Sequence, residues 1–223
     1  MADASHELKT PLTVILANTG ILLRHPDDTI MQQQKWVDST KAEGERMKEL
    51  IDHMLFLAKT DADQMPLSFS PLDLSDTLWS CLLPFESVAF EQGIALDPQV
   101  EADITVNGDA AQLKQLIMIL LDNACKYAAR CSTISVSLIR SQETAEAVLS
   151  VHNQGEAIPA EDLPHIFERF YRVDASRSRS AGGYGLGLAI AKTIADRHKA
   201  SLRVNSSAPE GTTFILRLPL KDN

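Results

Sequence analysis

Apolar residues recur at helical spacing through the first sixty residues of the chain. In residues 4–24 they fall on one side of a helix, and the pattern stops at 25–28, where HPDD has the composition of a turn. A second pattern begins near Thr29 and alternates steps of three and four residues over three heptads. It consists of Val37, Thr40, Gly44, Met47, Ile51, Met54 and Ala58. The two patterns predict two amphipathic helices joined by a short loop, the second about 45 Å long.

A hairpin of two such helices cannot enclose its own apolar stripe. The simplest way to bury that stripe is to pair with a second copy as a four-helix bundle, so the pattern predicts a homodimer formed through the hairpin. The alternative is a hairpin that packs against the C-terminal part of its own chain.

The periodicity breaks at 65–71, where two prolines and two serines mark a linker. Beyond it the pattern predicts helices at 75–92, 109–128 and 187–198, and strands near Ile104 and at 133–140, 145–152, 201–205 and 212–218. Helices and strands mix without the regular alternation of a doubly wound parallel sheet, which favours an α/β sandwich with a mainly antiparallel sheet. We therefore expect a helical hairpin at 1–64, a linker at 65–71 and a second domain at 72–223.

Composition narrows the function. The chain is 44% hydrophobic and 23% charged, as is typical of a globular protein with a sizeable core. Its net charge of -9 opposes binding to a nucleic-acid backbone, which needs clustered Lys and Arg. Three cysteines without metal-ligand spacing fit structural thiols in a reducing compartment. Without a long apolar run or a signal peptide, the sequence predicts a soluble chain.

The first predicted helix opens with SHELKTPL at 5–12. A neutral imidazole is both nucleophilic and largely unprotonated near pH 7, which makes His6 a candidate nucleophile. Glu7 can orient the ring or accept its proton. Pro11 cannot donate to the Glu7 carbonyl and is expected to kink the helix just past His6. Taken alone, a His-Glu pair on a helix is usually a solvated surface pair.

The helix predicted at 109–128 carries Asn123, Lys126 and Tyr127 along one edge, at i, i+3 and i+4. An amide oxygen suits Mg²⁺, and an ammonium suits phosphate oxygens. Such triplets also occur on plain surface helices, so the spacing alone does not define a site.

A glycine-rich segment, GGYGLGLA at 182–189, precedes an apolar helical pattern. Its glycines would let backbone N–H groups and a helix N-terminus approach phosphates closely, or would form a bare flexible loop. It follows FERFYR at 167–172 and a stretch that holds Arg177 and Arg179. Those two arginines are more typical of solvated charges than of ligands.

Taken in order, these segments resemble the phospho-acceptor, N, F and G2 boxes of sensor histidine kinases, over the chain from His6 to Leu218. The resemblance implies the ATP-binding fold shared with gyrase and mismatch-repair ATPases, and a lid over the nucleotide at 174–182. It implies catalytic roles for His6, Glu7 and Thr10. The residues it implies for ATP binding are Asn123, Lys126, Tyr127, Asn153, Gly155, Ala157, Ile158, Arg172, Gly183, Gly185, Leu186, Gly187, Leu188 and Thr212, with Asn123 also binding Mg²⁺.

The resemblance also implies partners. The phosphoryl group would pass from His6 to an aspartate in the receiver domain of a response regulator, docked on the hairpin near Ile15, Leu16 and Asn18. Those three residues are equally compatible with the core and surface of the bundle. Membrane contact would come only through sensor and membrane-spanning segments N-terminal to this sequence. The chain would then be the cytoplasmic portion of a bacterial inner- or plasma-membrane protein.

Two positions depart from the family pattern. The G1 box usually carries Asp and two glycines, but the chain has Asn153 at the Asp position and Ala157 at the second Gly. Asn153 offers one acceptor oxygen and a donor amide without charge, so we expect weaker ATP binding and a relaxed preference against GTP. Ile119 stands where many relatives have a second Asn near Mg²⁺, which predicts an altered dependence on the metal.

The resulting expectation is a kinase that autophosphorylates His6 from ATP. It would also dephosphorylate its regulator, because Thr10 completes a His-Glu-x-x-Thr arrangement; otherwise the Thr10 hydroxyl simply bonds to the His6 carbonyl. The main alternative is a degenerate kinase acting as a dimeric regulator-binding scaffold. A second alternative is a stand-alone ATPase of the gyrase-like fold.

Overall fold

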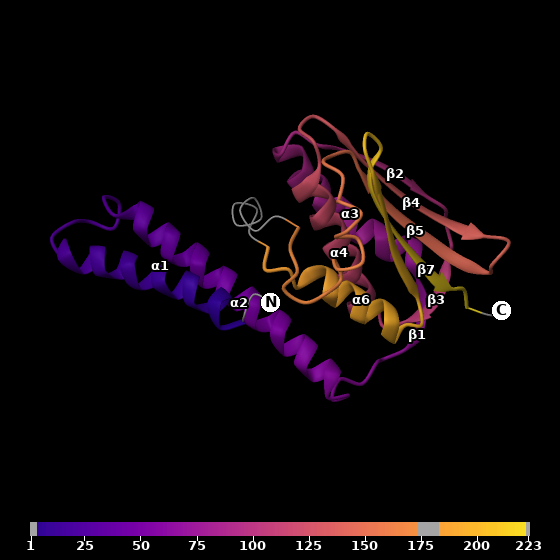
Figure 1. The fold of residues 1–223 in the computed structure, drawn as a ribbon, viewed down its shortest axis with the longest axis horizontal. Coiled ribbons are helices and arrows are strands. Elements are labelled where there is room, and N and C mark those ends of the chain that lie inside the picture. The colour runs from indigo at the N-terminus through magenta and orange to yellow at the C-terminus, as the bar shows by residue number, and fades with distance from the viewer. Residues whose placement is uncertain (1–3, 174–182, 222–223) are drawn as a thin grey trace. The chain divides into compact units, whose positions relative to one another are not determined.

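The computed structural model describes residues 4–173 and 183–221 of the chain (Figure 1). It divides into two compact units, and each is described by itself. The first comprises residues 1–64 together with 168–187, and the second comprises 65–167 together with 188–223. Segment 168–187 thus groups with the hairpin, although the sequence pattern places it in the second domain.

The hairpin of the first unit consists of α1 (Ala4–Arg24) and α2 (Gln34–Asp61). The first helix has the predicted bounds, whereas the second begins five residues after the predicted start at Thr29. The intervening residues form a turn instead, since Nε2 of the buried Gln33 donates to the His25 carbonyl at 2.7 Å and the Thr29 N–H donates to Oε1 of Gln32 at 2.7 Å. These side-chain bonds compete with the first helical turn.

The apolar stripe of the hairpin is only partly covered within the chain. Leu50 and Leu57 on α2 are buried. Other large apolar side chains remain open to solvent: Leu12 (44%), Leu16 (63%), Leu23 (76%), Ile51 (40%) and Leu55 (50%). An exposed row of this kind on a helical hairpin is typical of a surface that another polypeptide covers.

The second unit is built on a five-stranded sheet of order β2-β4-β5-β7-β6. Its strands are β2 (Ala95–Val100), β4 (Thr133–Ser141), β5 (Glu146–Asn153), β7 (Gly211–Pro219) and β6 (Ser201–Ser207). Only the β2–β4 pair is parallel. A separate antiparallel pair joins β1 (Ser70–Asp73) to β3 (Thr105–Gly108). The predicted α/β sandwich with a mainly antiparallel sheet is confirmed.

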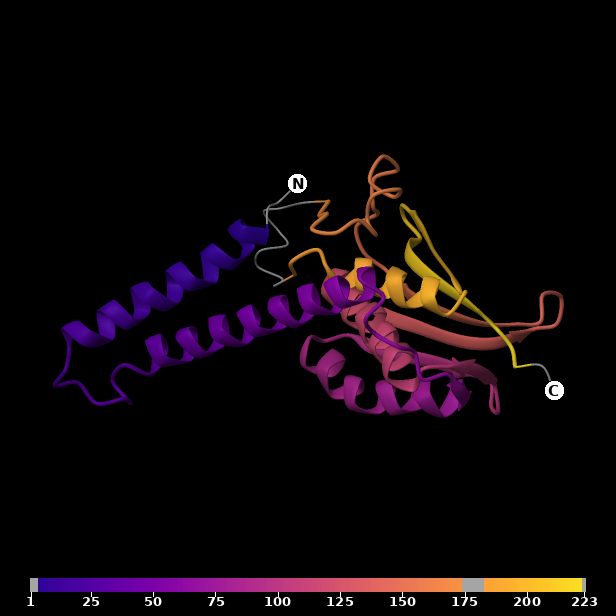
Figure 2. The same cartoon turned by 90° about the horizontal axis from the view of Figure 1, so that it is seen from below.

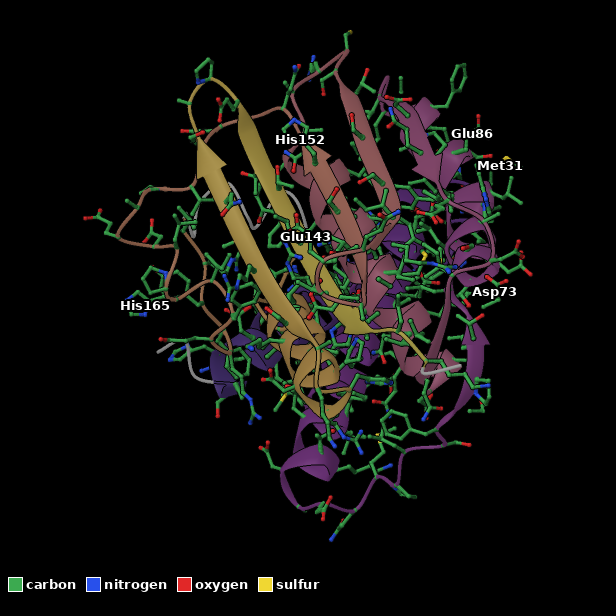
Figure 3. The ribbon with its side chains drawn as sticks, turned by 90° about the vertical axis from the view of Figure 1, so that its right-hand side faces the viewer. Met31, Asp73, Glu86, Glu143, His152 and His165 are labelled. Carbon is green, nitrogen blue, oxygen red and sulfur yellow. The ribbon has the colours of Figure 1, made fainter. Side chains whose placement is uncertain are left out.

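Three helices, α3 (Leu74–Glu91), α4 (Ala110–Tyr127) and α6 (Gly187–Arg197), cover one face of this sheet (Figures 1 and 2). Every second residue of β5 and β7 is buried beneath them, so the core lies between the helices and the sheet. The other face lies open in Figure 3, where His152 is labelled. Its exposed rows are partly polar, with Ser137 Oγ bonded to Ser150 Oγ at 2.7 Å and His152 Nδ1 to Thr213 Oγ1 at 2.9 Å.

The sequence pattern did not predict two of the strands. β1 begins at Ser70, within the segment predicted as linker, and contains Pro71; β2 contains Pro98. Proline is depleted in strands because it lacks an N–H to donate, so both segments resemble loops in isolation. β1 and β2 form strands because β3 and β4 pair with them. β1 and β2 tolerate proline because they lie at sheet edges.

The core of the second unit gives a test of this packing. Leu116 on α4 is fully buried, and Leu116→Ala removes methyl groups and leaves a cavity. We expect the free energy of unfolding to fall by about 2–5 kcal/mol. The measurement is urea unfolding followed by Trp79 fluorescence in a Trp36→Phe background. Leu83→Ala, at an exposed leucine of α3, is the control and should change stability by less than about 0.5 kcal/mol; equal losses in the two variants would contradict the packing.

Candidate active site

The candidate nucleophile lies in the first turns of α1. His6 is exposed, Glu7 is half-buried, and Pro11 is buried within a helix that runs on to Arg24. Thr10 Oγ1 donates to the His6 carbonyl at 3.2 Å. Glu7 lies in the first helical turn, where its charge suits the helix dipole. The imidazole is therefore open to solvent on a rigid element, beside a carboxylate.

The second group of predicted residues lies at the C-terminal end of α4. This helix begins at the N-cap Asp109 and presents Asn123, Lys126 and Tyr127 along one edge, as predicted. Asn123 is half-buried and Tyr127 is 49% exposed. Lys126 Nζ forms an ion pair with Asp122 Oδ2 at 2.7 Å, so it would have to exchange that carboxylate for a phosphate.

The loop after β5 is fixed against this end of α4. The Ala129 N–H donates to the Gln154 carbonyl at 2.7 Å. A Cβ at Gly155 would overlap the Tyr127 carbonyl, so only glycine allows the two backbones to approach this closely. The predicted residues Asn153 and Gly155 are thereby brought next to the edge that carries Asn123 and Tyr127.

Asn153 ends β5 and is 1% exposed. Its Nδ2 approaches the Gln154 carbonyl at 3.5 Å, a long and therefore weak hydrogen bond. In the sheet it lies opposite Thr212 of β7. A neutral amide thus occupies a nearly dry position, with most of its hydrogen-bonding capacity available to a ligand.

Sequence reasoning missed two residues that hold this loop. The Ile158 N–H donates to Ser206 Oγ at 2.9 Å, and Ser206 Oγ bonds to Thr212 Oγ1 at 2.8 Å. Gly211 has φ +95°, and a Cβ there would overlap the Asn153 carbonyl. The sequence could have indicated Gly211, because a glycine stands there just before a predicted strand that begins with β-branched residues. No local feature of the sequence indicates Ser206. Ser206 thus links Ile158 to Thr212 by two hydrogen bonds. These bonds join two of the predicted ATP-binding residues in one hydrogen-bond network.

The remaining predicted residues belong to the first unit, except Leu188, which belongs to the second. Phe170 N donates to the Gly185 carbonyl at 2.9 Å, and Gly185 has φ +71° in close contact with the Tyr171 backbone. Leu186 is buried, whereas Gly183 has free space around its Cα. Gly187 and Leu188 form the first turn of α6, which carries no acidic residue and is therefore suited to an anion. Segment 174–182, with Arg177 and Arg179, lies outside the described residues.

Two arginines near this loop differ in their partners. Arg169 forms a bidentate ion pair with Asp61 at the end of α2, both distances 2.7 Å. The hydrogen bonds from Arg169 hold the pKa of Asp61 below its ordinary value. Arg172, the predicted phosphate ligand, has Nε and Nη2 buried without a hydrogen-bond partner in the described part of the chain. Such unsatisfied donors suit an anionic ligand.

The donor set for a metal is sparse. Within residues 4–173 and 183–221, no group of three or more His, Cys, Asp or Glu residues could hold a metal ion. Asn123 offers one amide oxygen, and Ile119 one turn earlier offers none. This fits Mg²⁺ carried mainly by phosphate oxygens and waters, and does not fit an all-protein site.

The candidate site residues therefore fall into two groups, and each group is described within its own unit. The second unit brings together the edge of α4, Asn153, Gly155, Ala157, Ile158 and Thr212, with Leu188 at the start of α6. The first unit holds His6, Glu7 and Thr10, and separately Arg172 and the glycine loop 183–187. No helix in the described part of the chain is long and apolar enough to cross a membrane.

Comparison with known proteins finds one family in the N-terminal part of the chain and another in the C-terminal part. The phospho-acceptor domain of histidine kinases (HisKA) matches residues 1–63, and the histidine kinase-, DNA gyrase B- and HSP90-like ATPase family matches residues 108–222. The chain is 36% identical to the sensor histidine kinase YkoH of Bacillus subtilis over 215 residues, covering 96% of the chain and 46% of that protein. It is also 36% identical to the sensor histidine kinase CusS of Escherichia coli over 223 residues, covering 98% and 44%. The chain thus spans less than half the length of these relatives.

A solved structure shows the same fold. The Acinetobacter baumannii histidine kinase AdeS superposes with a TM-score of 0.78 at 19% identity, covering 97% of the chain and 98% of that protein. At this identity the likeness concerns the fold alone. Together with the two family matches and the 36% identity to sensor kinases, it confirms the resemblance seen in the sequence: the chain belongs to the family of two-component sensor histidine kinases.

Proposed function

We propose that the chain autophosphorylates His6 from ATP and passes the phosphoryl group to an aspartate in the receiver domain of a response regulator. One observation carries this proposal: an exposed imidazole lies on the phospho-acceptor hairpin of a chain that also matches the ATPase family and has Asn123, Lys126 and Tyr127 along one edge of α4. Against the scaffold alternative stand His6, Asn123, Lys126 and the glycine loop. Against a stand-alone ATPase stands the phospho-acceptor helix itself.

The chemistry needs few groups from the protein. A ring nitrogen of His6 attacks the γ-phosphorus of ATP in line, the bond to the β–γ bridging oxygen breaks, and ADP leaves. Glu7 holds the ring or takes the proton that the imidazole loses. The Arg172 guanidinium, unsatisfied among the described residues, is suited to balance phosphate charge. Mg²⁺, held by Asn123 and phosphate oxygens, would supply further charge neutralisation.

The proposed assembly is a homodimer formed through the hairpin at 1–64, with a linker at 65–71 and the catalytic domain at 72–223. The exposed stripe of α1 and α2 supports a second copy as its cover. The expected regulator surface is smaller than the sequence suggested, because Asn18 is 4% exposed and donates to Ser39 Oγ within the hairpin, leaving Leu16 exposed. As in membrane-bound sensors, we place the chain on the cytoplasmic side, with membrane contact only through N-terminal segments.

Autophosphorylation is the direct test. Purified chain is incubated with [γ-³²P]ATP, and we expect label that is lost completely in His6→Gln because no other residue is placed as acceptor. His25→Gln, in the exposed turn of the hairpin, is the matched control and should label normally. No label in the wild type, with ATP still bound, would favour the scaffold. ATP hydrolysis that persists unchanged in His6→Gln would favour the stand-alone ATPase.

Nucleotide selectivity tests the role of Asn153. Its buried amide can accept from the adenine amino group or, flipped, donate to a guanine carbonyl. Asn153→Asp restores a charged acceptor and is expected to tighten ATP binding by about 1 kcal/mol, roughly fivefold, while weakening GTP binding. Calorimetric titration of both nucleotides gives the result. Asn205→Asp makes the same charge change at an exposed position of β6 and should leave both affinities unchanged; identical ATP and GTP affinities in Asn153→Asp and wild type would refute the role.

Thr10 separates phosphatase from kinase activity. Its hydroxyl bonds to the His6 carbonyl, so regulator dephosphorylation requires it to turn toward a water. We expect Thr10→Ala to slow dephosphorylation of a phosphorylated regulator by roughly tenfold or more and to retain His6 labelling. Thr13→Ala removes an equivalent bond, from Thr13 Oγ1 to the Lys9 carbonyl at 2.8 Å, and is the control. Full-rate dephosphorylation by Thr10→Ala would exclude a phosphatase role for this hydroxyl.

A further inference from the structure

The linker that leaves α2 is held to the second unit by four side chains that phosphoryl transfer does not use. We name Asp109, Gln112, Arg197 and His198 the linker anchor. Asp109 precedes α4 and Gln112 lies in its first turn, while Arg197 ends α6 and His198 follows it. All four belong to the second unit, as does the linker from residue 65 onward.

Arg197 joins the linker to α4. Its Nη1 donates to Oε1 of Gln112 at 3.2 Å, and its Nη2 donates to the carbonyl of Met65. Gln112 is 4% exposed, so its amide is a fixed partner. The guanidinium therefore holds the first linker residue to a buried point of the unit.

Asp109 holds the linker three residues later. One carboxylate oxygen accepts from the Gln112 N–H at 3.1 Å as the N-cap of α4, and the other accepts from the Ser68 N–H at 3.1 Å. Although burial opposes it, these backbone donors keep the pKa of Asp109 below its ordinary value. The same carboxylate that starts the helix thus fixes the linker backbone.

His198 completes the anchor as a buried, neutral ring. Its Nε2 accepts from the Asp109 N–H at 3.0 Å, and its Nδ1 bonds to the Ile194 carbonyl at 2.8 Å. Burial lowers its pKa, which favours this neutral form. Phe69 of the linker packs on the ring with centroids 5.1 Å apart. Gly108 allows the contact, since a Cβ there would crowd His198.

The anchor makes the tether between α2 and the second unit very short. On the α2 side, the Gln64 N–H donates to the Lys59 carbonyl at 2.9 Å, so the chain is still fixed to the helix there. The anchor begins at Met65. Without it, the next fixed linker residue is Ser70, which pairs with Gly108 in the β1–β3 ladder. Release would lengthen the free tether from one peptide to about five residues, adding reach of roughly 15 Å.

We propose that Arg197, Asp109 and His198 are positioning residues for phosphoryl transfer: by shortening the tether they raise the effective concentration of the ATP site at the phospho-acceptor histidine. The proposal rests on the proposed function. Effective concentration falls steeply as a flexible tether lengthens. Releasing the anchor therefore slows His6 phosphorylation by roughly three- to tenfold and leaves ATP affinity unchanged, whether the acceptor lies on the same chain or on its dimer mate.

The test compares Arg197→Gln with Arg203→Gln, which removes an exposed arginine of β6 instead, in the full chain. Three quantities are measured: the labelling rate of His6 at saturating ATP, the ATP dissociation constant, and amide hydrogen exchange across residues 65–69. Arg197→Gln should slow labelling and speed exchange, with the ATP dissociation constant unchanged. Arg203→Gln should match wild type in all three.

A second variant isolates tether length from folding. Four residues, Gly-Ser-Gly-Ser, are inserted between Gln64 and Met65 with the anchor intact. This insertion should slow His6 labelling as Arg197→Gln does, without faster amide hydrogen exchange at 65–69. In the combined variant, the labelling rate should fall by a smaller factor than the product of the two separate factors.

Three results would overturn the proposal: an unchanged rate in the insertion variant, a loss in Arg197→Gln that appears as weaker ATP binding, or unchanged exchange in Arg197→Gln. A wild-type chain that takes up no label contradicts the proposed function instead, and hydrogen exchange alone then decides whether the anchor exists.

Discussion

Burial of the apolar face of α4 against the sheet is the interaction on which the nucleotide half of the site depends. Leu113, Leu116 and Leu120 are fully buried on this face, and together such burial contributes several kcal/mol. It also fixes the rotation of the helix. A change of one residue in register would turn the Asn123 edge by about 100°, away from the loop that packs on the Tyr127 carbonyl. The core therefore determines where the candidate site residues of α4 lie.

The sequence predicted those features that depend on local periodicity. Residues of α1, α3, α4 and α6 were placed within one or two positions because each helix has a long apolar face and clear ends. The family motifs indicate the candidate site residues for the same local reason. What could not be predicted depends on partners distant in sequence. Ser206 acts through Ile158, 48 positions away, and β1 and β2 become strands because β3 and β4 pair with them at sheet edges, where proline is tolerated.

A polar residue within the apolar pattern of the hairpin left two interpretations open. Asn18 was expected near the docking surface of the regulator or in the bundle core, and it is buried and bonds to Ser39 on the neighbouring helix. Burying a single polar pair costs desolvation free energy. The pair nevertheless favours one alignment of two apolar faces that could otherwise pack in several registers. The adjacent Leu16 keeps its exposure. Periodicity therefore identified the apolar stripe. It could not tell which residues beside the stripe are buried between the two helices and which remain exposed to solvent.

The proposed function divides recognition of the nucleotide unequally between its base and its phosphates. Asn153, the proposed partner of the base, is neutral, and a neutral hydrogen bond contributes roughly half as much as a charge-assisted one. Arg172, by contrast, keeps two buried N–H groups without partners among the described residues. Each unmet donor costs about 1–3 kcal/mol in the free protein, and a phosphate oxygen would recover that cost on binding. The charge on the phosphates changes most as the γ-phosphoryl group leaves. Under the proposed function the protein therefore stabilises the phosphates more than the base, and a weakly held base is compatible with efficient transfer.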